Sequence, residues 1–108
     1  MLLPADTTIK VEKLTQYLLI PLPVDDKSKF LAKAGYTLEN WQRLQQDLRT
    51  QVLSQPAELR ETTQYGDKYF IRARLIGPNQ VQLKVLTVWM VTELEARFVT
   101  LVPDKGAE

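Results

Sequence analysis

The chain contains no cysteine and no histidine. Without cysteine it can form no disulfide bond, thiolate nucleophile or thiolate metal site, which argues against a small secreted scaffold. Without histidine it lacks the commonest general base and metal ligand, so any catalysis would depend on Lys, Arg, Tyr, Thr, Ser or carboxylates. The sequence also carries no cofactor fingerprint. We therefore expect neither a metal site nor a cofactor.

Net charge and long apolar runs are lacking as well. The 14 Lys and Arg residues nearly balance the 13 Asp and Glu residues, so no overall field attracts nucleic acid or an anionic membrane. No apolar run approaches the length that crosses a bilayer, and residues 1–8 do not resemble a signal peptide. We expect a cytoplasmic protein without membrane contact, in which any anion binding comes from local clustering of cations.

The composition is that of one ordinary globular domain. With 108 residues, of which 44% are hydrophobic, the chain is long enough to bury a core without staples. No internal repeat or linker divides it. We expect a single domain over residues 1–103, followed by a frayed tail over residues 104–108.

Helical spacing of apolar residues predicts three helices in the first half of the chain. The first spans residues 11–19 and stops before the prolines at 21 and 23. The second begins at Asp25 and Asp26, which are commoner as helix caps than as cation ligands, and ends at Gly35. The third and longest spans residues 38–53.

From Pro56 the apolar period changes from helical spacing to alternation, which indicates antiparallel strands. We expect a polar edge strand over residues 58–63, a turn at Gly66 and Asp67, and further strands over residues 68–76, 81–91 and 97–102. The fold class is therefore α+β, with about three N-terminal helices on one face of a three- to four-stranded antiparallel meander.

Even- and odd-numbered residues of the expected strands 68–76 and 81–91 point to opposite sides of the sheet. Odd-numbered residues such as Ile71 and Val85 are mostly apolar, so we expect them to face the helices. Odd positions of one strand must then pair with odd positions of the other, across a loop such as residues 78–80. The outward set mixes cations with apolar residues: Phe70, Arg72, Arg74, Lys84, Leu86 and Val88.

This outward set has two interpretations. In one, the cations are solvated and the apolar residues are covered by an N-terminal helix or by the tail. In the other, it is a binding face, because single-stranded nucleic acid requires cations for its phosphates and rings for its unstacked bases.

Short motifs spread along the chain resemble a family of small uncharacterised bacterial proteins, a domain of unknown function. The family supplies no established activity. The motifs are KLTQYLL (13–19), KSKFLAKAG (27–35), Trp41, YGDKY (65–69), GPN (77–79), TVW (87–89) and RFVTLVP (97–103).

A fainter similarity extends to the compact fold of barnase-like and RelE-like ribonuclease toxins, which also place helices before an antiparallel meander. It implies RNA as the substrate and a metal-independent attack by the 2′-hydroxyl group. In the related pattern, a histidine often stands directly before the lysine that corresponds to Lys27. This chain has Asp26 at that position instead. The similarity implies cations that stabilise a phosphorane and a hydroxyl group, that of Thr100, that orients it. The catalytic candidates are Lys27, Lys68, Arg72, Arg97 and Thr100.

Two functional hypotheses follow. The first is a non-enzymatic interaction module whose outward set binds a small partner protein or a second copy of the chain. The alternative is an RNA-binding or RNA-cleaving module. We favour the first at this stage because binding needs only a surface, whereas catalysis also needs a proton carrier that the sequence does not identify.

Overall fold

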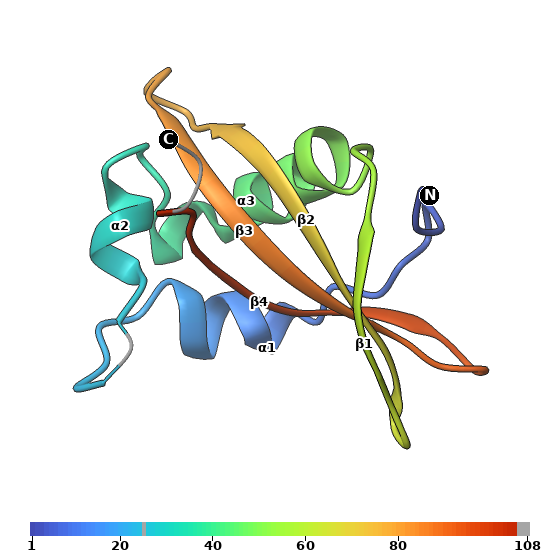
Figure 1. Cartoon of the computed structure of the whole chain (residues 1–108). Coiled ribbons are helices and arrows are strands. Elements are labelled where there is room, and N and C mark those ends of the chain that lie inside the picture. The colour runs from blue at the N-terminus through green and yellow to red at the C-terminus, as the bar shows by residue number, and fades with distance from the viewer. Residues whose placement is uncertain (25, 106–108) are drawn as a thin grey trace.

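The computed structural model describes residues 1–24 and 26–105, and it has the expected α+β architecture. Helical segments occupy the first half of the chain, and the second half forms a four-stranded antiparallel sheet in the order β1-β2-β3-β4 (Figure 1). Within the described residues, none of the helices has the length and apolar character that crossing a bilayer requires.

Both longer helical stretches change their hydrogen-bond pattern part-way along. The helical elements are α1 (Val11–Lys13), η1 (Leu14–Leu18), α2 (Ser28–Ala32), η2 (Leu38–Asn40), α3 (Trp41–Asp47) and η3 (Leu48–Val52). The segments η1 and η3 are π turns, closed by bonds of 3.0 Å from the Leu19 amide to the Leu14 carbonyl and 2.8 Å from Leu53 to Leu48. The expected helical stretches are therefore present, but not as uniform α-helices.

The second helix is shorter than its pattern predicts. It begins at Ser28, and its N-cap residue is Lys27. Asp26 lies one residue before the cap, where its Oδ1 accepts bonds from the Ser28 amide at 2.9 Å and the Ser28 hydroxyl at 2.6 Å. Asp25 lies outside the described residues. Gly35 adopts φ +92°, and the next amide donates back to the Leu31 carbonyl, so the predicted left-handed cap is confirmed.

The sheet has the predicted register. Its strands are β1 (Glu58–Thr63), β2 (Gly66–Ile76), β3 (Gln82–Val91) and β4 (Ala96–Pro103). Ile71 lies opposite Thr87 and Ala73 opposite Val85, so odd positions pair with odd positions. A bond of 3.1 Å from the Gly77 amide to the Val81 carbonyl closes the β2–β3 loop.

The expected turn at Gly66 and Asp67 is wrong by two positions. Thr63 lies opposite Gly66, so the turn residues are 64 and 65, and both predicted turn residues belong to β2. The Thr63 hydroxyl explains the shift, because it accepts a bond from the Tyr65 amide and donates one to the Gly66 carbonyl. Gly66 is still required, because at φ +136° a Cβ atom would lie 2.6 Å from the Val91 carbonyl oxygen.

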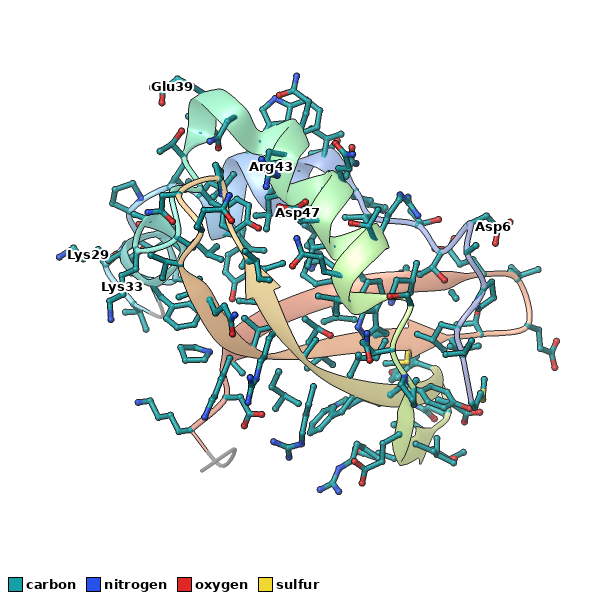
Figure 2. The ribbon with its side chains drawn as sticks, turned by 90° about the horizontal axis from the view of Figure 1, so that it is seen from above. Asp6, Lys29, Lys33, Glu39, Arg43 and Asp47 are labelled. Atoms are coloured by element: carbon teal, nitrogen blue, oxygen red, sulfur yellow. The ribbon has the colours of Figure 1, made fainter. Side chains whose placement is uncertain are left out.

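The inward side of the sheet and the helical segments η1, α2, α3 and η3 enclose the core (Figure 2). Trp89 is fully buried, with its ring edge-on to Phe98 at a centroid distance of 5.2 Å. Its indole Nε1 donates to the buried Thr87 hydroxyl at 2.7 Å, and that hydroxyl donates to the Ile71 carbonyl. Trp41 is only partly buried against the core. Both tryptophans therefore serve packing, as expected.

A buried polar cluster joins the longest helix to the end of β2. Arg43 and Asp47 project from α3 (Figure 2), and Asp47 Oδ2 accepts bonds from the Tyr36 hydroxyl at 2.6 Å and Arg43 Nε at 2.8 Å. Burial of the phenol raises the pKa of Tyr36 far above its ordinary value, and the Asp47 carboxylate raises it further. The phenol therefore stays protonated in the folded chain.

This cluster predicts a loss of stability at alkaline pH. Above about pH 10 the unfolded chain releases the Tyr36 proton while the folded chain keeps it, so the free energy of unfolding falls by roughly 1 kcal/mol per pH unit from this group. We expect Tyr36→Phe to lack that component and to cost about 1–3 kcal/mol at neutral pH. Urea denaturation between pH 8 and pH 11 measures both effects. Equal alkaline slopes in the two proteins would contradict the assignment.

Candidate functional site

The even-numbered residues of β2 and β3, with their partners on β4, form the side of the sheet away from the core. We call this the outer face, and its residues lie in rows across the strands. The rows are Lys68–Met90–Arg97, Phe70–Val88–Thr100, Arg72–Leu86–Val102 and Arg74–Lys84. Cations thus occupy both ends of the face, and apolar side chains fill its centre.

No described helix covers the outer face, because η1, α2, α3 and η3 bury their apolar residues in the core on the opposite side of the sheet (Figure 2). Arg72, Arg74 and Lys84 are exposed. The apolar residues at the centre are half-buried: Phe70, Leu86, Val88 and Met90. The face is therefore open, but its apolar part is shielded by its own neighbours.

One of these neighbours is an arginine on the edge strand. The Arg60 guanidinium lies 5.2 Å from the centroid of the Phe70 ring, within the range of a cation–π contact. The same guanidinium pairs with Glu58 at 3.3 Å. Phe70 is thus a partly buried aromatic ring with a cation over it.

Along β4, three side chains from distant parts of the chain meet at the margin of the outer face. Lys27 Nζ donates to the Tyr17 hydroxyl at 2.7 Å, and the Thr100 hydroxyl lies 3.5 Å from the same oxygen. Thr100 points outward because it pairs with Val88. An ammonium group and two hydroxyl groups therefore border the outer face together.

A cleft of about 430 Å³ adjoins this cluster, between the first helix and β4. It is lined by Lys10, Glu12, Lys13, Tyr17, Val99 and Thr100. Two lysines face one glutamate there, so the cleft extends the positive charge of the outer face around the edge of the sheet.

The catalytic candidates do not converge on a single centre. Lys27 and Thr100 meet through Tyr17, whereas Lys68 and Arg97 lie in one row with Met90 between them. Arg72 lies two rows away from Lys68 and pairs with Asp104 at 2.7 Å. The candidates therefore form three separate groups on one face.

Sequence reasoning missed two residues of this region. Tyr17 has helical spacing with core residues, so its pattern predicts packing, and nothing in it indicates a bond to Lys27. Asp104 falls in the expected tail, yet its side chain is only 4% exposed. Asp104 directly follows β4, and its amide bonds to the Lys84 carbonyl, which the composition of the tail does not indicate.

Asp26 is a poor substitute for the histidine of the related pattern. The bonds from the Ser28 hydroxyl and amide lower the pKa of Asp26, so it binds a proton more weakly than an ordinary carboxylate. Across residues 1–24 and 26–105, no three Asp or Glu side chains gather as metal ligands would.

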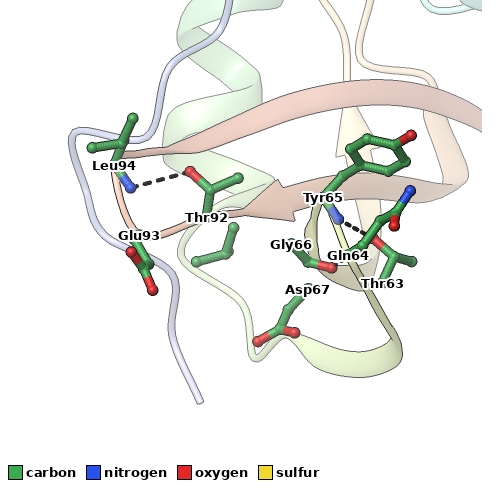
Figure 3. A pocket seen from close by; sticks show the side chains of 9 residues that line it. Thr63, Gln64, Tyr65, Gly66, Asp67, Thr92, Glu93 and Leu94 are labelled. Carbon is green, nitrogen blue, oxygen red and sulfur yellow. Dashed lines mark hydrogen bonds between the residues drawn. The ribbon is translucent and has the colours of Figure 1, made fainter.

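A cleft of about 670 Å³ lies between the β1–β2 and β3–β4 turns. Figure 3 shows the Asp67 and Glu93 carboxylates at its rim. Leu94 and Tyr65 in the same turns are 95% and 74% exposed. These two carboxylates lie at the opposite end of the β2–β3 ribbon from Arg74 and Lys84.

The model of one family matches this chain over residues 5–105, and its description is a domain of unknown function, DUF6883. The chain belongs to the DUF6883 family. The expected resemblance to a small uncharacterised family is therefore confirmed, and the match includes every residue of the outer face and the Lys27–Tyr17–Thr100 cluster. The DUF6883 description assigns no activity to them.

No curated protein and no solved structure matches the chain. The similarity to barnase-like and RelE-like toxins stays a prediction, and a function for this DUF6883 chain has to be argued from its own surface.

Proposed function

We propose that the chain is a binding module for single-stranded RNA, which lies across the outer face of the sheet. The observation that supports it best is that cations from three strands share this side with the partly buried ring of Phe70. Such a surface suits a flexible polyanion, because phosphates need cations and unstacked bases need a ring.

A second candidate is a partner protein or a second copy of the chain on the same face. The contiguous apolar residues Phe70, Leu86, Val88 and Met90 favour it. All four are partly buried, whereas Arg72, Arg74 and Lys84 are exposed, so the charged groups of this face are more accessible than its apolar ones. This is why RNA becomes the stronger proposal once the side chains are placed.

Salt dependence tests the proposal. We expect a labelled single-stranded RNA to be retained with the protein on filters at about 50 mM salt and to be released steeply by about 200 mM, because phosphate binding displaces counterions. No retention of any RNA at low ionic strength would rule the function out. If the chain instead sediments as a dimer that Val88→Asp converts to a folded monomer, the second candidate is correct.

The same samples show whether bound RNA is cut. The sequence alone identifies no proton carrier for such a reaction. The Lys27–Tyr17–Thr100 cluster supports cleavage as a possibility to test, because it brings an ammonium group and two hydroxyl groups together. In such a step the 2′-oxygen of a ribose would lose its proton and bond to the adjacent phosphorus, and the bond from phosphorus to the 5′-oxygen would break. The 5′-oxygen would take up one proton, so no net proton is gained or lost, and a 2′,3′-cyclic phosphate would remain. RNA recovered intact would make the chain a binding module only.

A further inference from the structure

The structure places a carboxylate of the chain itself among the cations at one end of the outer face. Asp104 directly follows β4, and its amide donates to the Lys84 carbonyl at 2.9 Å. Its carboxylate accepts a bond of 2.7 Å from Arg72 Nη1. The Asp104 side chain is 4% exposed and the Arg72 side chain 50%, so the carboxylate is buried beneath an arginine that stays open to solvent.

The cations around this carboxylate outnumber it. A hollow of about 220 Å³ is lined by Arg72, Ala73, Arg74, Lys84 and Asp104. Arg74 and Lys84 lie directly opposite each other on β2 and β3, where like charges destabilise a sheet. Among the described residues that line the hollow, one carboxylate offsets only part of the three positive charges, so the hollow favours an anion with more charge and more acceptor oxygens.

A phosphate group meets this requirement better than Asp104 does. Its non-bridging oxygens can accept two parallel bonds from a guanidinium group and further bonds from a lysine. Moving the Asp104 carboxylate away breaks its ion pair with Arg72, whereas the bond from the Asp104 amide to the Lys84 carbonyl belongs to the main chain and can remain. Asp104 lies beyond Pro103, the last paired residue of β4, so this movement breaks no strand pairing.

We propose that Arg72, Arg74 and Lys84 form a phosphate subsite, which the Asp104 carboxylate occupies in the free chain and yields when a phosphate of the bound strand arrives. The inference rests on the proposed RNA function, since it names where one phosphate of that strand lies. The internal carboxylate lowers the affinity of the face for anions and makes binding depend on its displacement.

Asp104→Asn tests the subsite, because it keeps the shape of the side chain and removes its charge. The matched control is Asp67→Asn, which changes the net charge equally but lies at the hairpin tip. We expect filter retention to show oligouridylate binding to Asp104→Asn roughly tenfold more tightly than to the wild type, with Asp67→Asn within about twofold of the wild type.

Inorganic phosphate provides a second probe that does not depend on RNA. We expect NMR titration to shift the Arg72 and Arg74 guanidinium signals at roughly tenfold lower phosphate concentration in Asp104→Asn than in the wild type. In the wild type, the Asp104 carboxylate signal should move together with that of Arg72. This last measurement keeps the test decisive even if the variant does not fold.

The outcomes separate the two ideas. If the wild type binds RNA but Asp104→Asn binds RNA and phosphate no more tightly, the subsite is wrong and the RNA function stands. If no protein retains RNA while phosphate displaces Asp104 as described, the subsite stands and the RNA function is wrong. Phosphate that leaves the wild-type Arg72 and Asp104 signals unchanged at saturation would overturn the subsite.

Discussion

The Trp89→Ala variant is expected to lose about 3–5 kcal/mol of its free energy of unfolding. Trp89 is fully buried, contacts Phe98 edge-to-face, and donates a hydrogen bond to the buried Thr87 hydroxyl. Removal of the indole leaves a cavity and deprives the Thr87 hydroxyl of one hydrogen-bond donor. A domain of this size has a total stability of roughly 5–15 kcal/mol, so the loss is a large part of it. Urea denaturation followed by far-ultraviolet circular dichroism measures the change.

Trp41→Ala is the matched control for this prediction. Trp41 is only partly buried at the margin of the core, and it is the other tryptophan of the chain. Because part of its ring is already in water, its loss should cost clearly less, about 1–2 kcal/mol. Equal losses in the two variants would contradict the central place that the structure gives to Trp89.

The double variant Arg74→Glu/Arg97→Glu is expected to weaken RNA binding roughly 100-fold at low salt, because it removes two phosphate contacts and adds two repulsive charges. Arg74 and Arg97 lie at opposite ends of the outer face, so a strand that crosses it meets both. The slope of log affinity against log salt concentration should also fall by about 1.4, which is 0.7 for each lost contact with a single strand. Filter retention over a series of salt concentrations measures both quantities.

Lys29→Glu/Lys33→Glu is the control, because it changes the net charge by the same amount at exposed positions in and just after α2 (Figure 2). It should reduce RNA affinity by no more than about threefold, since only the weak long-range field changes. If both double variants weaken binding equally, RNA responds to net charge alone and the outer face is not its site.

Much of the fold follows from local patterns in the sequence. Alternation from Tyr69 to Leu75 predicts which side of β2 is buried, because successive side chains of a strand point to opposite sides and a one-residue slip would bury arginines. The left-handed conformation of Gly35 follows equally directly, since few other residues adopt it at the end of a helix. Such features depend on neighbours within a few positions.

Other features depended on bonds that periodicity does not encode. The β1–β2 turn moved by two positions because the Thr63 hydroxyl bonds to two backbone groups of the turn. The helical stretches end in π turns, although their apolar spacing fits a regular helix. Hydrogen-bond choices of this kind differ little in free energy, so tertiary packing selects among them.

The candidate site divides in the same way. The sequence by itself determined that Arg72, Arg74 and Lys84 share the outward side of a β-ribbon, because parity is a property of the extended backbone. Only the tertiary structure decided that Lys27 and Thr100 meet at Tyr17 and that Asp104 lies under Arg72. Those contacts join residues 10, 83 and 32 positions apart, and such distances close only when the helices dock and β4 completes the sheet.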